Sequence, residues 1–504
     1  MSTATSRPSP QATAARERGD ACPGALRLHP ADDGALARVR IPGGVLTLPQ
    51  AEALADAARR LGDGDLHLTS RGNVQLRGLA EGCGAELAAL LDAAGLLPSS
   101  AHERVRNVVA SPLSGLDGRG CGEVRPWLTA LDGELCASGP ARELSGRFLF
   151  ALDDGRGDVA GLGADVTLRA AADGGAVLWA GPLDEERYVA ERVWVAWQDA
   201  PRAARVAAEA FVGVGRGGGG VGGDGVGGFS GDGGGFSRAG GGGGGGGRDA
   251  GGGFGPDGGG SRRDGRGAPV WRVAELGDAR GALNRAIRAR LADAGIGFRA
   301  AHGEPVATPD SAGPPPGIAG SALSVHVPLG RITPSQWRAL IGTAGAGELR
   351  LTPWRGVIVP TAETAWSDRA TRTGTERGAD FAVASARLSA TGLVTAPGSP
   401  WSRVGACVGR PGCARSRADV RADAERALAG AAHAPLPVYW SGCERRCGHP
   451  AGDHIDVVAT APDGHGRGDG QSYDVSVVTG GHRAPPVRAT GPTDLTTALT
   501  ALAH

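Results

Sequence analysis

A single tract of glycine divides this chain. Between residues 213 and 260, 30 of 48 residues are glycine. A segment of this composition buries too little apolar surface to offset the entropy that ordering would cost. We therefore expect a disordered, flexible insertion over 213–268, with an N-terminal and a C-terminal part of similar length on either side.

The two parts repeat one order of strands and helices. In each, a short apolar strand leads to a Thr and a Pro that can begin a helix: Thr47 with Pro49, and Thr333 with Pro334. A second strand follows, at 66–69 and at 349–352, and each strand ends near an Arg-Gly pair, at Arg71 and at Arg355. The matching order indicates an internal duplication.

The composition excludes several classes of function. Basic and acidic residues number 53 each, so no basic excess is available to neutralise nucleic-acid phosphates. All the basic residues are arginine, so no lysine can form a Schiff base or act as a general base. No apolar run approaches the ~18 residues of a membrane span, and the N-terminus lacks the apolar run of a secretory signal. We expect a cytoplasmic protein that binds neither nucleic acid nor membranes.

Four of the eight cysteines form the strongest motif. Five residues separate Cys407 from Cys413, and three separate Cys443 from Cys447. Four thiolates can hold a [4Fe–4S] cluster, because each iron needs one outer ligand. Structural zinc usually takes closer pairs, and cytoplasmic thiols stay reduced, which disfavours disulfides. We predict a cluster on these cysteines and structural roles for the others, which are Cys22, Cys83, Cys121 and Cys136.

The residues around the motif fit this interpretation. Gly412 and Gly442 let the backbone approach the inorganic core closely. Ser416 and Asp419 predict a capped helix over 417–430. The apolar run 436–440 predicts a buried strand that leads directly into Cys443.

The cysteine spacing resembles the cluster motif of the siroheme sulfite and nitrite reductases, which are also internally duplicated. The run from Leu68 to Gln75 is similar to their Thr-x-Arg-x-x-x-Gln segment, which grips the tetrapyrrole, and Arg106-Asn107 resembles an Arg-Asn pair on the same pocket. The resemblance implies an α+β fold with two ferredoxin-like half-domains and two cluster-type α/β domains. The expected segments are a disordered tail 1–20, half-domain 21–99, reductase-like domain 100–212, insertion 213–268, half-domain 269–365 and cluster domain 366–504.

Within that superfamily, four segments resemble the precorrin-3B synthases of aerobic cobalamin biosynthesis. They are Cys22-Pro-Gly, the run His67–Gly78, the run Arg147–Gly155, and Ser441-Gly-Cys443 with the residues up to Pro450. This resemblance implies an O2-dependent monooxygenase that hydroxylates precorrin-3A at C20 and closes a lactone. It also implies a [4Fe–4S] cluster, a separate mononuclear non-haem iron and an external electron donor.

The resemblance further suggests which residues bind the substrate. Precorrin-3A carries many carboxylates, and a guanidinium binds a carboxylate through two parallel hydrogen bonds. The expected substrate-binding residues are Arg71, Asn73, Gln75, Arg77, Arg106, Asn107, Arg147 and Arg355. No residue is assigned to O2 activation; His29, His67 and His102 are the candidates for the second iron.

The alternative function is that of a siroheme-dependent sulfite or nitrite reductase. Those enzymes place two cations over the siroheme to hold a small anion. The corresponding stretch here is Arg147-Phe148-Leu149, which keeps one cation and replaces the other by an apolar side chain. The loss of one cation weakens an electrostatic clamp that anion reduction needs, and favours the synthase.

Overall fold

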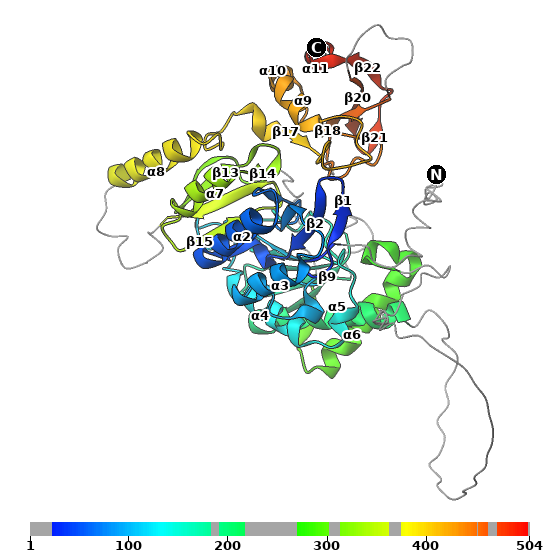
Figure 1. The fold of residues 1–504 in the computed structure, drawn as a ribbon. Helices are drawn as coiled ribbons and strands as arrows, with labels where there is room; N and C mark the ends of the chain where they lie inside the picture. The colour runs from blue at the N-terminus through cyan, green and yellow to red at the C-terminus, as the bar shows by residue number, and fades with distance from the viewer. Residues whose placement is uncertain are drawn as a thin grey trace, which may run out of the picture.

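Four β-sheets organise the chain in the computed structural model, which describes residues 23–182, 191–216, 270–301, 313–361, 374–450, 452–461 and 471–501. Two five-stranded sheets with their helices form the middle of the molecule, and an α/β domain lies on either side of them (Figure 1). Within these described ranges, no helix is long and apolar enough to cross a membrane.

The first half-domain is an antiparallel sheet with two helices on one face. Its strands, in spatial order, are β1 (His29–Ala31), β2 (Gly34–Val39), β5 (Val74–Leu79), β4 (Leu66–Leu68) and β14 (Arg331–Ile332). Its helices are α2 (Leu48–Leu61) and α3 (Gly84–Ala93). Thr47 caps α2 through a reciprocal pair of hydrogen bonds with Gln50, as the Thr-Pro pattern predicted.

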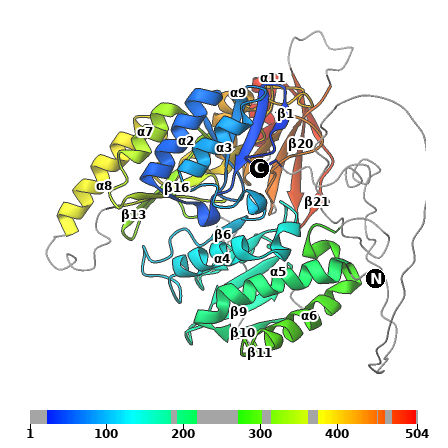
Figure 2. The same ribbon diagram turned by 60° about the horizontal axis from the view of Figure 1, so that its bottom comes forward.

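The second half-domain repeats this plan. Its strands, in spatial order, are β12 (Gly317–Ala319), β13 (Ala322–His326), β16 (Gly356–Pro360), β15 (Glu348–Leu351) and β3 (Val45–Thr47). Its helices are α7 (Pro334–Ile341), capped by Thr333, and α8 (Gly374–Ser389). The two halves exchange edge strands, because β3 of the first half pairs with β15 while β14 of the second half pairs with β4. Side chains from both halves fill one continuous apolar core, and α2 lies beside α7 (Figure 2).

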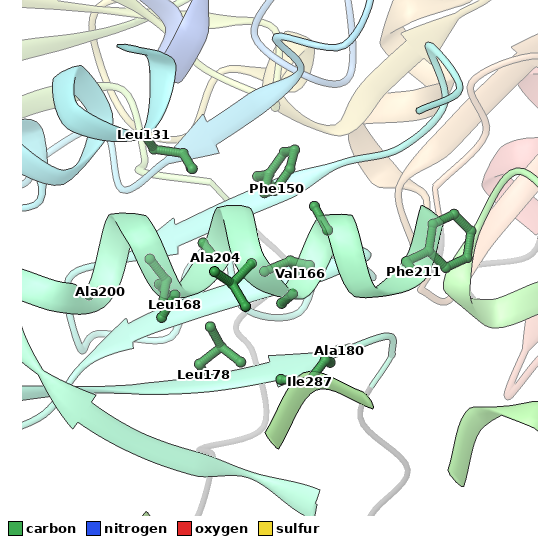
Figure 3. Packing of buried hydrophobic residues seen from close by; sticks show 14 of the residues in the cluster. Leu131, Phe150, Val166, Leu168, Leu178, Ala180, Ala200, Ala204, Phe211 and Ile287 are labelled. Atoms are coloured by element: carbon green, nitrogen blue, oxygen red, sulfur yellow. The ribbon is translucent and has the colours of Figure 1, made fainter. Parts of the chain in front are cut away.

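The third sheet belongs to the α/β domain that follows the first half-domain. Its strands, in spatial order, are β11 (Phe298–Ala300), β10 (Val193–Ala196), β9 (Gly175–Ala180), β8 (Val166–Ala170), β7 (Phe150–Asp153) and β6 (Val108–Ala110). Its helices are α4 (Arg125–Ala137), α5 (Ala200–Arg216) and α6 (Arg280–Asp293). Figure 3 shows α5 lying across this sheet, where Phe211 and Ala204 pack with Phe150, Val166 and Leu168.

The fourth sheet belongs to the domain that carries the cysteine motif. Its strands are β17 (Val404–Ala406), β18 (Val438–Ser441), β19 (His454–Ala459), β20 (Ser472–Thr479) and β21 (His482–Arg483), with β22 (Val487–Thr490) also paired to β20. Its helices are α9 (Val420–Arg426), α10 (Leu428–His433) and α11 (Gly491–Ala501).

The two α/β domains repeat each other as well. In one, β6, β7 and β8 are parallel and β9 is antiparallel; in the other, β17, β18 and β19 are parallel and β20 is antiparallel. The internally duplicated α+β architecture expected from the sequence is therefore confirmed.

Two expected boundaries differ from the strand pairing. Residues 270–301 supply α6 and β11 to the third sheet, so they belong with the preceding α/β domain and not with a half-domain that begins at 269. Phe381 and Leu388 of α8 lie in the half-domain core, which places α8 before the cluster domain expected from 366. The expected tail and Cys22 lie outside the described residues, as does the glycine insertion apart from 213–216, which end α5.

Candidate functional site

Two adjacent parallel strands bring two of the motif cysteines together. Cys407 directly follows β17, and Cys443 follows β18 after one glycine. The backbone N–H of Cys407 donates to the carbonyl of Trp440 at 2.9 Å. The Gly442 N–H donates to the Sγ of Cys407 at 3.2 Å. The expected strand is present as β18.

The remaining two cysteines are held by turns around this pair. The carbonyl of Cys413 accepts from the Ser416 N–H at 2.9 Å, and the carbonyl of Cys447 accepts from the Tyr439 hydroxyl at 2.7 Å. A side chain at Gly442 would collide with Ser416, since a Cβ there would lie 1.9 Å from its Oγ. Ser416 is therefore a packing residue; the helix cap is Asp419, which accepts from the Ala422 N–H at the start of α9.

The four thiols are not arranged as the ligands of a single metal ion. All four cysteines are free. In the part of the chain that the structure describes, no three of their sulfur atoms lie within 4.8 Å of one another. A tetrahedral zinc ion with bonds of about 2.3 Å would draw the sulfurs closer than that, whereas a cubane binds each thiolate to a different iron. Burial, reinforced by the neighbouring cysteines, raises the pKa of Cys407 and of Cys447.

Three guanidinium groups contact the loops that carry the cysteines. Arg77 forms a bidentate pair with Asp33 at 2.8 Å and donates to the carbonyl of Gly412. Arg421 donates to the carbonyl of Cys407 at 3.3 Å, and Arg355 donates to the Tyr439 hydroxyl at 3.3 Å. Burial, followed by the charges of neighbouring arginines, lowers the pKa of Arg421 to about 10, so its side chain is still a cation at pH 7.

A cavity of about 380 Å³ opens on the first half-domain. Four arginines line it together with small polar residues: Pro23, Arg38, Arg40, Thr69, Ser70, Arg71, Asn73 and Arg147. The strand register relates this cavity to the cysteines. Arg38 of β2 and His67 of β4 both stand opposite Gln75 of β5, on one face of the sheet. Arg77 lies two residues further along β5, on that same face, and reaches the cysteine loop. Cavity and cysteines thus share one face of the sheet.

The expected substrate residues separate into three groups. Arg71, Asn73 and Arg147 line the cavity, and Gln75 lies beside it. Arg77 and Arg355 are at the cysteine loops instead. Arg106 and Asn107 are buried and internally bonded. Arg106 forms a bidentate pair with Asp132 at 2.7 Å, and Asn107 links Asn73 to the carbonyl of Phe148.

Sequence reasoning missed Arg38, Arg40 and Arg421. The first two could have been found, because Val39 is buried between them and period-two alternation puts both arginines on the opposite face. Arg421 gave no such signal, since its contact with Cys407 depends on how α9 packs beneath β17.

Of the three candidate ligands for a second iron, His67 alone lies in a group of described residues that could hold a metal ion. His29 is exposed, and both ring nitrogens of His102 are hydrogen-bonded, to Ser99 and to the Ser138 carbonyl. His67 does lie with Asp63 and Asp65, their ligand atoms within 4.8 Å of one another.

Two arginines contact the atoms with which Asp65 and His67 would bind a metal ion. Arg331 binds Asp65 at 2.5 Å, and Arg421 approaches Nδ1 of His67 at 3.3 Å. A guanidinium only donates, so the neutral ring carries its proton on Nε2, which faces Asp63 at 3.5 Å. A metal ion would have to displace this proton and compete with Arg331 for Asp65.

The other α/β domain holds a counterpart of the cysteine site, with a serine in the place of Cys407. Ser111 follows β6 as Cys407 follows β17, and its N–H donates to Leu152 of β7 just as that of Cys407 donates to Trp440. The Asp154 N–H donates to the Ser111 Oγ at 3.1 Å, as Gly442 does to sulfur. In this copy, Asp154 is paired with Arg156, which also binds Asp117. Asp153 and Asp154 accordingly belong to a buried polar network.

Comparison with known proteins agrees with this architecture. The family model described as "Nitrite/Sulfite reductase ferredoxin-like half domain" matches residues 29–94 and 319–365. A solved structure of the Mycobacterium tuberculosis NirA protein superposes with a TM-score of 0.62 over 93% of this chain and 79% of that one, at 18% sequence identity. The chain therefore shares the fold of that protein over most of its length, and two of its segments match the ferredoxin-like half-domain of nitrite/sulfite reductases.

Within that class, the chain is similar to a precorrin-3B synthase from Sinorhizobium sp. The two are 34% identical over 168 residues, which cover 33% of this chain and 36% of that protein. A ferredoxin–nitrite reductase from Synechococcus elongatus is 37% identical over 127 residues, covering 24% of this chain and 25% of the relative. The matched segments thus span about a third or less of these curated relatives.

Proposed function

We propose that this chain is a precorrin-3B synthase, which hydroxylates precorrin-3A at C20 with O2 and closes a lactone. The observation that carries the proposal is the arginine-lined cavity on the sheet face that also meets the cysteine loops. The similarity to a precorrin-3B synthase supports the choice of reaction.

The cavity suits a polycarboxylate. Arg38, Arg40, Arg71 and Arg147 line it from β2, from the turn after β4 and from the segment before β7. Arg147 is itself positioned by Trp271, with its guanidinium carbon 4.4 Å from the ring centroid. Cations that approach from several segments can fix the orientation of a flexible tetrapyrrole, so that a single bridge carbon is presented for oxidation.

Cys407, Cys413, Cys443 and Cys447 would hold a [4Fe–4S] cluster in this enzyme, which supplies single electrons at low potential. Buried amides and carbonyls keep these cysteines in place, and the arginines nearby offset negative charge. The electrons come from an external donor protein. We place the reaction in the cytoplasm, where thiolate ligands stay reduced.

A siroheme-dependent nitrite or sulfite reductase is the second candidate, favoured by the similarity to ferredoxin–nitrite reductase. The surroundings of Leu149 favour the synthase. Leu149 is 3% exposed and packs with Val109, Ala151 and Trp354 in a small apolar cluster. A second cation for a small anion would have to come from elsewhere in the chain.

Anaerobic purification with subsequent analysis distinguishes the two functions. The synthase should contain four irons and four sulfides for each chain, show no siroheme absorption, and incorporate label from 18O2 into precorrin-3A when a reductant is supplied. Bound siroheme with reduction of nitrite or sulfite would replace this proposal by the second candidate.

A further inference from the structure

The arginines near the cysteines differ in how their charge is balanced. Arg77 is paired with Asp33, and Arg331 is paired with Asp65. Among the described residues, neither Arg355 nor Arg421 contacts a carboxylate. Their polar contacts are Tyr439 and the Gly448 carbonyl for Arg355, and His67 and the Cys407 carbonyl for Arg421.

Both of these guanidiniums are tied to cluster ligands. Arg421 donates directly to the carbonyl of Cys407. Arg355 donates to the Tyr439 hydroxyl, which itself donates to the carbonyl of Cys447, and its guanidinium carbon lies 5.5 Å from the Tyr439 ring centroid. Arg355 also adopts a left-handed backbone conformation, with φ of 59°, in order to stand there.

Two partly buried cations without carboxylates require an anion nearby, because desolvated positive charge is costly. A cubane held by four thiolates is such an anion. Its net charge becomes one unit more negative on reduction, so a fixed cation stabilises the reduced form more than the oxidised form.

We propose that Arg421 and Arg355 are positioning residues that raise the reduction potential of the cluster and so help it to accept an electron from the donor. This inference rests on the proposed cluster. Arg331, whose charge Asp65 already balances and whose side chain is 55% exposed, should contribute little.

The test is a redox titration of the full-length chain, purified anaerobically, with the cluster followed by electron paramagnetic resonance. The variants are Arg421→Gln and Arg355→Gln, with Arg331→Gln as the matched control. At the potential where half of the wild-type cluster is reduced, Arg421→Gln should lower the ratio of reduced to oxidised cluster at least tenfold, or 59 mV for one electron. Arg355→Gln should also lower this ratio, and Arg331→Gln should change it by less than twofold.

Lysine variants at these two positions distinguish the effect of the positive charge from that of the planar guanidinium group. Arg421→Lys and Arg355→Lys return the cation without the planar fork, so their ratios should lie within threefold of the wild type. If a Gln variant loses its cluster and the Lys variant regains it, charge is again the cause. Unchanged potentials in the Gln variants, an equal shift in Arg331→Gln, or cluster loss with Gln and Lys alike would overturn the inference. Absence of four irons and four sulfides from the wild type would instead overturn the proposed cofactor.

Discussion

Arg71 and Arg106 carry the same side chain in very different surroundings. Arg71 lines the cavity, while Arg106 is 5% exposed and bound to Asp132 and the Leu96 carbonyl. The sequence could not distinguish them, because Asp132 lies 26 residues from Arg106 and joins it only when α4 packs. That Cys407 and Cys443 lie close together could be predicted, because the spacing of the four cysteines is typical of a shared site.

Replacing each arginine by alanine should separate binding from stability. Arg71→Ala should weaken precorrin-3A binding about ten- to hundredfold, because a charged hydrogen bond contributes about 1.5–3 kcal/mol. Arg106→Ala should leave affinity near that of the wild type but lower the free energy of unfolding by about 1–3 kcal/mol, since Asp132 loses its partner. Binding titration and chemical unfolding of both variants measure this. Equal losses of affinity would return Arg106 to the substrate site.

A single cysteine substitution tests the cluster assignment. Cys443→Ser should lose most of the cluster iron and sulfide, and because a metal site built by folding also stabilises the fold, its thermal midpoint should fall. The control is Cys121→Ser, at an exposed cysteine of the other α/β domain. This variant should keep its iron and sulfide content and its thermal midpoint. Iron and sulfide analysis with a thermal melt is sufficient. Full cluster content in Cys443→Ser would disprove its role as a ligand.

At the scale of elements, the repeat expected from the strands 66–69 and 349–352 is present, but the Arg-Gly pairs that follow these strands are offset by one residue. A glycine follows both Arg71 and Arg355, yet the two arginines are not equivalent. The hydrogen bonds instead equate Thr69 with Thr352, since each residue donates its N–H to the carbonyl four residues later and its Oγ accepts the N–H of that residue. Arg71 therefore corresponds to Trp354. The Leu-Thr pairs that end the strands, at 68–69 and at 351–352, give this register from the sequence.

In the other α/β domain, the loop after β7 carries a carboxyl group with a raised pKa. This loop occupies the position of the Cys443–Cys447 turn, and its Asp158 accepts from the Ser111 Oγ at 2.6 Å. Burial, with the charge of Asp153 as the next cause, raises the pKa of Asp158 to about 7 from an ordinary 3.8. A raised carboxyl pKa means that stability is fully present near pH 4 and is lost as the pH rises through 7.

Asp158→Asn should remove this pH dependence. Relative to the variant, the wild type should lose stability as the pH rises from about 4 to about 7, by at most ~4 kcal/mol at about 1.4 kcal/mol for each pKa unit. Thermal melts of both proteins across this range provide the measurement. A constant difference between their midpoints would show that Asp158 titrates alike in the folded and unfolded chains.

At the scale of the whole molecule, the duplicated plan was predictable, but the connections between the halves were not. The repeat of strand, capped helix and strand carries a strong pattern in both copies. The exchanged strands β3 and β14 have three and two residues, too few for any periodicity. The assignment of 270–301 to the preceding domain likewise depends on one pairing, β11 with β10.

The glycine tract joins two helices of one domain, so its removal should be tolerated. Arg202 of α5 donates to the Ala294 carbonyl just after α6 at 2.7 Å, and the two helices share a core. A variant in which a short Gly-Ser linker replaces 217–268 should keep its thermal midpoint and its cluster content. A variant with a Gly-Ser segment of the original length controls for sequence. Unfolding of the short variant alone would indicate too short a connection, and unfolding of both would indicate a structural role for the tract.

Because the halves exchange edge strands, the first sheet can be completed only late in the synthesis of the chain. The first sheet lacks its last strand until Ile332 has left the ribosome, 253 residues after Leu79. At about 5–20 residues per second, that interval is roughly 10 to 50 s. Throughout it, the edge of β4 that later pairs with β14 is open to any extended segment nearby. A nascent chain of this protein therefore spends about half of its translation with an unfinished sheet, and we expect its yield to depend on chaperone capacity.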